Sequence, residues 1–208
     1  MPVFPEKLND LMKEVCAEWN DAEKAIKRAE QLVGDAVIPA IKELRYSGRR
    51  IIEATNLITT DGPEDRIDHL LRDALFNCHR AQHDAIDASV ATINVHIDRI
   101  QRRVSDKVII DVFDDYPELL AARDAVHEQV AEARENRESR DAIYDSIRRI
   151  EFTRLEKVYK KFRSSESVMR RRTVRGRWAA LGGWIIAGFT IITGFAATYF
   201  GYIDFSSS

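Results

Sequence analysis

Apolar side chains recur every three to four residues along most of the chain, which is the period of an amphipathic helix. The first such stripe spans residues 8–33 and stops at Gly34, a residue type that commonly follows a helix. A second stripe spans residues 41–58, with Asp35 placed to cap its helix and the turn sequence 61–63 placed to end it. The pattern therefore predicts two long helices joined by a short turn.

The second half of the chain continues the helical period with one interruption. A third stripe runs from about residue 63 to about residue 104, and its first half consists mostly of small side chains. Residues 105–116 are irregular, and residues 108–113 fit either a short strand or a helical turn. A fourth helix is predicted over residues 117–162, with an exposed polar middle at residues 133–141. Because no strand-like alternation appears, the sequence predicts an all-α fold.

Residues 178–203 form a run of 26 residues without a charged side chain. As a helix this run would be roughly 39 Å long, and the hydrocarbon core of a bilayer is about 30 Å thick. The alternative is a buried core helix, but such helices rarely stay uncharged over more than about 18 residues. The run therefore predicts one C-terminal transmembrane helix.

These patterns divide the chain into four parts. Residues 1–163 are expected to form a cytoplasmic bundle of long antiparallel helices. Residues 164–177 form a basic juxtamembrane segment, and its start, residues 164–167, is the only plausible hinge. Residues 178–203 follow as the transmembrane helix, and residues 204–208 form a short outer tail.

Charge is distributed unevenly along the chain and sets the expected orientation. Residues 1–153 carry 22 Lys or Arg against 31 Asp or Glu, whereas residues 154–177 carry ten against two. Because positive residues stay on the cytoplasmic side, the N-terminal part is expected in the cytoplasm and the C-terminus outside. In the cytoplasm, Cys16 and Cys78 are expected to be reduced thiols packed in the core. The arginines nearest the span are predicted to contact lipid headgroups, with nucleic acid as the alternative partner: Arg170, Arg171, Arg172, Arg175 and Arg177.

Small side chains follow a seven-residue repeat inside the uncharged run. They occupy both core positions of the repeat: Ala180, Gly183, Ala187, Thr190, Gly194, Ala197 and Gly201. Small residues let helices approach closely in lipid, so this seam predicts a left-handed homo-oligomer. With more than two copies the seam could surround a pore, with Thr190 midway and a ring of Asp204 at the outer mouth attracting cations. The alternatives are a seam that packs shut and a lone anchor in which small residues align by chance.

A local basic site stands out within the acidic N-terminal part. Arg45 and Arg49 lie one helical turn apart, Tyr46 supplies a ring, Arg50 adds a further charge, and Gly48 would let a ligand or another backbone approach. Arginines with an aromatic neighbour suit a phosphate-bearing ligand such as a nucleotide or single-stranded DNA. The alternative is that these arginines pair with acidic side chains of a neighbouring helix.

The candidates for catalysis are few. Arg72 and His79 lie seven residues apart on one helix face, and this pair resembles the RNase motif of HEPN domains, which are helical bundles that dimerise and cleave RNA. Neighbouring core positions place His79 beside the core rather than in a cleft. His79, His83 and Asp87 share a face and could hold a metal ion, but the Glu of a metalloprotease motif is missing. We therefore expect no catalytic residues, no metal and no cofactor.

The layout of the whole chain, a helical domain followed by a basic segment and one span, resembles the small membrane effectors of bacterial anti-phage defence, specifically Hailong-type effectors. The HEPN-like pore proteins associated with CRISPR systems are similar in plan. The resemblance implies a homo-oligomeric channel in the inner membrane that a nucleotide or oligonucleotide gates and that depolarises the cell during abortive infection. A membrane-tethered RNase and a non-catalytic membrane scaffold are the alternatives.

Overall fold

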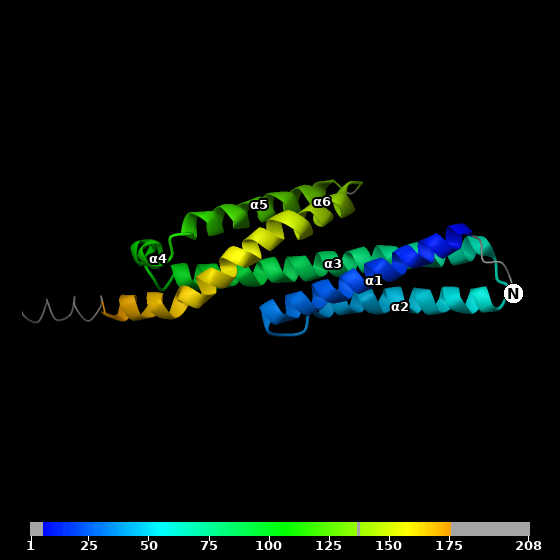
Figure 1. Cartoon of the computed structure of the whole chain (residues 1–208), viewed down its shortest axis with the longest axis horizontal. Coiled ribbons are helices and arrows are strands. Elements are labelled where there is room, and N and C mark those ends of the chain that lie inside the picture. The colour runs from blue at the N-terminus through cyan, green and yellow to red at the C-terminus, as the bar shows by residue number, and fades with distance from the viewer. Residues whose placement is uncertain (1–5, 137, 176–208) are drawn as a thin grey trace, which may run out of the picture. The chain divides into compact units, whose positions relative to one another are not determined.

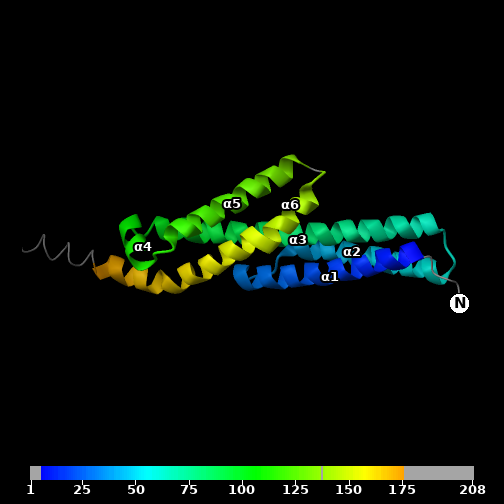
Figure 2. The same ribbon diagram turned by 45° about the horizontal axis from the view of Figure 1, so that its top comes forward.

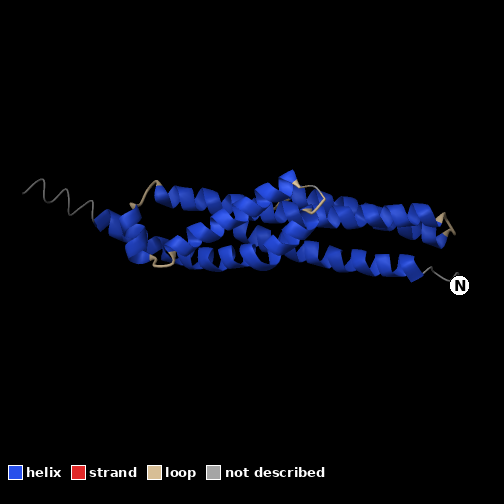
Figure 3. Ribbon diagram, turned by 90° about the horizontal axis from the view of Figure 1, so that it is seen from above, coloured by secondary structure: helices blue, strands red, loops and turns tan. Residues whose placement is uncertain are grey.

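A computed structural model describes residues 6–136 and 138–175 of the chain, and within these residues all regular structure is helical (Figure 3). The elements in chain order are α1 (Glu6–Val33), α2 (Ile38–Thr59), α3 (Glu64–Gln101), α4 (Asp106–Val112), α5 (Tyr116–Glu135), α6 (Arg140–Ser146) and the π-helical turn η1 (Ile147–Glu151). Residues 152–175 continue as a helix. The described chain forms two compact units, residues 6–99 with 117–159, and residues 100–116 with 160–175. The all-α prediction is confirmed.

Helices α1, α2 and α3 lie side by side in the first unit (Figures 1 and 2). One core cluster joins Leu8 and Val15 of α1 to Ala54 of α2 and Leu71 of α3. A second cluster is built mainly from small side chains: Ala22, Ala29, Ala40, Cys78, Ala81 and Ala85. Small residues at these positions let the three helix backbones lie close together, and several of them belong to the stripe of small side chains in the third helix.

The turns between these helices follow the sequence signals in most respects. Gly34 ends α1 with a positive φ of 81°, and Asp61 takes a φ of 51° before Pro63 starts the next helix. Asp35 does not cap α2, because its carboxylate accepts a hydrogen bond from the adjacent backbone N–H of Ala36 at 2.7 Å. Val37 is the N-cap residue instead, without a side-chain hydrogen bond.

The fourth helix predicted from the sequence is two helices. Helix α5 ends at Glu135 and α6 begins at Arg140, and the two helices form a hairpin (Figure 1). Within the first unit, α5 contacts α3 through the hydrogen bond between Asn94 and His127, 2.6 Å, and through the ion pair of Arg134 with Asp87, 3.3 Å. The polar stretch expected as an exposed helix surface is therefore the end of one helix and a turn.

The second unit has a small aromatic core. Phe162 packs edge-on against Phe113, with ring centroids 5.5 Å apart, and stacks on Tyr116 at 6.2 Å. The Tyr116 hydroxyl accepts a hydrogen bond from Gln101 at 2.7 Å. The segment that fitted either a strand or a helical turn is α4, whose Ile109 is fully buried.

Two further expectations are corrected. Residues 164–167 lie inside the helix that continues to residue 175, so they are not a hinge. Cys78 is buried as expected, but Cys16 is exposed, and both thiols are free.

Within residues 6–136 and 138–175, no helix is both long enough and apolar enough to cross a bilayer. The predicted span at residues 178–203 lies outside the described residues, as do its seam and Asp204.

Candidate functional site

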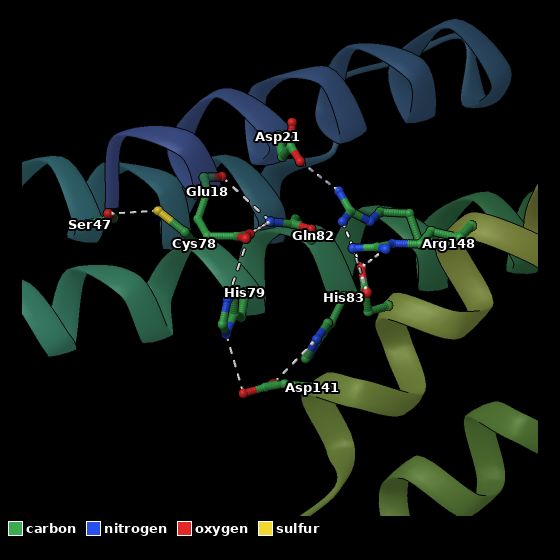
Figure 4. Close-up of polar contacts among 11 residues, drawn as sticks. Glu18, Asp21, Ser47, Cys78, His79, Gln82, His83, Asp141 and Arg148 are labelled. Atoms are coloured by element: carbon green, nitrogen blue, oxygen red, sulfur yellow. Dashed lines mark hydrogen bonds and ion pairs between the residues drawn. The ribbon is translucent and has the colours of Figure 1, made fainter. Parts of the chain in front are cut away.

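Two adjoining cavities open in the first unit where α1 and α3 meet α6 and η1 (Figure 4). We name the first the histidine cavity, about 300 Å³, whose principal polar lining residues are Glu18, His79, Gln82, His83, Asp141 and Asp145. We name the second the basic cavity, about 430 Å³, which is lined by Asp21, Lys24, Ala25, Arg28, Ala85, Ile86, Ser89, Arg148, Arg149 and Phe152. The two cavities share Ile86, Arg148 and Arg149, so their linings are continuous.

Asp141 of α6 joins both histidines of α3 in the histidine cavity (Figure 4). One carboxylate oxygen lies 3.3 Å from Nδ1 of His79 and the other lies 3.5 Å from Nε2 of His83. On the opposite side, Nε2 of His79 lies 3.6 Å from the Glu18 carboxylate of α1, which accepts a hydrogen bond from Gln82 at 2.7 Å. The two histidines thus connect α3 to a carboxylate on α1 and another on α6.

His83 is held as a neutral ring. It stacks on Tyr144 with centroids 3.8 Å apart, and its side chain is 13% exposed. Burial lowers the pKa of His83 to about 4, although Asp141 opposes the shift. Burial also raises the pKa of Tyr144, whose hydroxyl donates a hydrogen bond to Asp87 at 3.0 Å. Near neutral pH, His83 is therefore uncharged, and its ring can donate one hydrogen bond and accept another.

The π-helical turn η1 carries Arg148 and Arg149, two successive residues that both line the cavities. Arg148 donates to Asp21 of α1 at 3.0 Å and to Asp145 at 2.7 Å, and Arg149 binds the same Asp145 at 2.8 Å. The hydrogen bonds from Lys24 and then from Arg148 lower the pKa of Asp21. Each hydrogen bond in a π-helical turn spans one residue more than in an α-helix. Such turns are often found at functional sites.

Arg28 of α1 also lines the basic cavity. Its guanidinium is hydrogen-bonded to Glu156, which is 8% exposed, and it lies over the ring of Phe152 at 5.1 Å from the centroid. Ala85 and Ile86 form a buried apolar part of the lining. The cavity therefore has a cationic rim and an apolar floor.

The nearby pair of Ser47 and Cys78 offers no reactive thiol (Figure 4). Both side chains are fully buried, with Oγ of Ser47 3.1 Å from Sγ of Cys78. Burial raises the pKa of the Cys78 thiol, so the nucleophilic thiolate is disfavoured.

The arginines singled out from the sequence lie apart from these cavities. Tyr46, Arg49 and Arg50 of α2 line a groove of about 500 Å³ together with Arg80 of α3, whereas Arg45 is exposed and does not line it. The cations of the groove have acidic partners: Arg49 and Arg50 with Glu53, Arg50 with Asp73, and Arg80 with Glu43. Of the arginines singled out from the sequence, only Arg50 has the partner on a neighbouring helix that the alternative interpretation expected, since Glu53 belongs to α2 itself. Ligand binding at this groove stays a prediction.

Gly48 serves packing within this region. A Cβ atom at this position would lie 3.0 Å from the ring of Trp19, so the bare backbone of α2 accommodates an indole from α1. The close approach expected at Gly48 is therefore made by a side chain of the same protein.

The pair resembling a HEPN motif is separated in its contacts. Arg72 is exposed and its Nε donates to Asp68 at 2.6 Å, while His79 lines the histidine cavity. His79 is partly buried and lines a cavity, so the expectation that it lies outside any cleft is wrong. Asp87 bonds to Arg134 and Tyr144 instead of joining the two histidines. Among the described residues, no group of three or more His, Cys, Asp or Glu side chains is arranged to hold a metal ion.

The arginines predicted to contact lipid are partly described. Arg170, Arg171, Arg172 and Arg175 are exposed on the helix over residues 152–175, and Arg177 lies outside the described residues. Arg172 donates a long hydrogen bond, 3.4 Å, to the backbone carbonyl of Asp111.

Sequence reasoning missed the basic cavity entirely. Its cations come from α1 and η1, more than 100 positions apart in the chain, and each looks like an ordinary solvated charge in its own helix. Nothing in the sequence indicates that Arg148 and Arg149 line one cavity, because successive residues of an α-helix point in different directions.

Comparison with known proteins finds no matching family model, no similar curated protein and no similar solved structure. The function therefore has to be inferred from the side chains of this chain.

Proposed function

We propose that this protein is a homo-oligomeric membrane effector, in which a helical bundle senses a ligand and a C-terminal span permeabilises the membrane. The observation that carries the proposal is the uncharged run of 26 residues at 178–203, preceded by a segment with ten basic and two acidic residues. A long uncharged run next to dense positive charge is typical of a transmembrane helix with its basic flank on the cytoplasmic side. The bundle would then lie in the cytoplasm and residues 204–208 outside.

The exposed arginines of the helix over residues 152–175 support an arrangement at a lipid surface. Arg170, Arg171 and Arg175 precede the uncharged run by only a few residues. Basic residues in this position are attracted to anionic headgroups, each by about 1 kcal/mol. This segment would hold the bundle near the membrane.

The seam of small residues supports assembly and suggests a pore. Glycine, alanine and threonine at both core positions of the repeat would let several copies meet in the bilayer. The pore is formed from the same seam, with Thr190 and Asp204 exposed along the path. Loss of membrane potential, once the ligand that keeps the channel closed is released, would stop growth of the infected cell.

The experiment compares membrane potential in bacteria that express wild type, Gly194→Leu or Gly188→Leu. Gly194 lies in the seam, whereas Gly188 is a matched glycine on another face of the same repeat. We expect depolarisation with wild type and Gly188→Leu and at least tenfold less with Gly194→Leu at equal membrane-inserted amounts. Equal depolarisation by both variants, or none by wild type, would refute the channel.

The RNase alternative is separated by the same assay. If RNA cleavage were the activity, substitution of Arg72 or His79 by Ala would abolish toxicity, and the membrane would stay polarised with wild type and variants alike. For the channel, Arg72→Ala leaves depolarisation intact, because Arg72 is exposed and bound only within its own bundle. A scaffold predicts no toxicity for any variant.

A further inference from the structure

The basic cavity contains more cationic donors than its acids can satisfy. Four cationic side chains line it, from Lys24, Arg28, Arg148 and Arg149. Asp21 serves both Lys24 and Arg148, Asp145 serves both Arg148 and Arg149, and Glu156 serves Arg28. Three carboxylates thus face four cations, and each guanidinium has five N–H donors. An anionic group entering this cavity would find donors that the carboxylates leave available.

The geometry of the donors suits a tetrahedral oxyanion. Arg148 and Arg149 both bind the carboxylate of Asp145, a residue that lines the adjoining histidine cavity, so their two guanidinium groups can reach one small anion. Lys24 and Arg28 of α1 line the same cavity, and Lys24 shares Asp21 with Arg148. Arginine forks pair with phosphate through two parallel hydrogen bonds, and lysine adds a point charge.

The floor of the cavity adds a second requirement. Ala25, which is partly exposed, and the buried Ala85 and Ile86 form the apolar part of the lining beside the cations, and about 430 Å³ falls within the range of small-molecule sites. Inorganic phosphate alone would leave the apolar part of the lining in contact with water. A ligand with an anionic end and a compact apolar body would bury the floor and satisfy the rim together.

We propose that the basic cavity binds a phosphate monoester with a compact apolar or aromatic body. The phosphate lies against Arg148, Arg149 and Lys24, and the body lies over Ala85 and Ile86. This assignment deepens the proposed function, because it gives the sensing bundle its ligand class and moves the site from the groove on α2 to the cavity between α1, α3 and η1.

The test is isothermal titration calorimetry of the full-length protein in detergent with phenyl phosphate, AMP, inorganic phosphate and phenol. Lys24→Gln and Arg149→Gln are informative because their side chains are 76% and 69% exposed, so that their removal leaves the core intact. Lys13→Gln is the matched control, since Lys13 forms the same kind of pair with Asp10 on α1 that Lys24 forms with Asp21.

Phenyl phosphate or AMP is expected to bind at least tenfold more tightly than inorganic phosphate, with no binding of phenol. Lys24→Gln and Arg149→Gln each weaken binding about tenfold, as expected for loss of one charge-assisted hydrogen bond, and Lys13→Gln changes nothing. The proposal is overturned if no phosphate ester binds, if inorganic phosphate binds as tightly as its esters, or if Arg49→Gln alone removes binding.

The outcome is independent of channel activity. Gly194→Leu is expected to bind the ester like wild type, because residue 194 lies outside the bundle sequence. If the ester binds but wild type does not depolarise the membrane, the channel is refuted and the ligand site is supported. If wild type depolarises the membrane but binds no ester, the ligand site is refuted and the channel is supported.

Discussion

Two carboxylates in this protein each bind two side chains of another element. Asp141 faces both His79 and His83, and Asp145 binds two successive arginines. The spacing of the two histidines was enough to predict that they share a face. Their common partner lies about 60 positions further along the chain, so no local pattern could reveal it.

The neutral, buried ring of His83 makes stability depend on pH. The pKa of His83 is about 4 in the fold and 6.5 in a free histidine. Between these two pH values, His83 is protonated in the unfolded chain and neutral in the folded chain. Stability from this residue is complete above pH 6.5 and is lost as the pH falls towards 4. The loss is about 2 kcal/mol at pH 5 and about 3 kcal/mol at pH 4.

Urea unfolding at several pH values measures this effect. His83→Gln should flatten the decline in the free energy of unfolding between pH 6.5 and 4. His69→Gln is the control, because His69 is 75% exposed beside Asp73 and should leave the decline unchanged. A decline that is the same in wild type and His83→Gln would show that the His83 ring takes up its proton in the fold as readily as in the unfolded chain.

Helices α1, α2 and α3 were predictable because their signals are local. Gly34 and the turn before Pro63 act within a few residues, and a three-to-four period fixes which face is buried. The hairpin of α5 and α6 was missed because the apolar stripes on both sides of residues 136–139 read as one helix. Polar residues on a helix surface and polar residues in a turn look alike in sequence.

Insertion of Gly-Ser-Gly-Ser at two places tests these element boundaries. Between Glu138 and Ser139 the insertion lengthens a turn and should cost below about 1 kcal/mol. Between Ser165 and Glu166 it interrupts a helix and displaces Met169, which is fully buried, so it should cost about 3 kcal/mol or more. Thermal unfolding followed by circular dichroism gives both values, and equal costs would restore residues 164–167 as a hinge.

At the scale of the whole molecule, the helical bundle is seen in the structure, whereas the membrane span is predicted from the sequence. The bundle is defined by packing that the described residues display, whereas the span is a prediction from residues 178–203. The sequence predicted the class of the bundle but not its cavities, since a cavity depends on how three helices meet. The orientation of the predicted span in the membrane can be predicted without a structure, because it depends on how Lys and Arg are distributed along the sequence and not on packing.

Single-channel recording from purified protein in planar bilayers tests the pore at this scale. Thr190→Leu should lower conductance several-fold by narrowing the path midway, and Asp204→Asn should weaken cation selectivity by removing the acidic ring. Ser206→Ala in the outer tail serves as a control that leaves both unchanged. Unchanged conductance and selectivity in the first two variants would remove the pore and leave only an anchor.

The buried contact of Ser47 with Cys78 gives the chain a built-in chemical reporter. The sequence has two cysteines, one exposed on α1 and one sealed between α2 and α3. A maleimide reagent therefore modifies Cys16 at once and reaches Cys78 only when those helices separate. The rate of the second modification measures how often α2 and α3 separate, with and without added phenyl phosphate, and requires no label to be introduced.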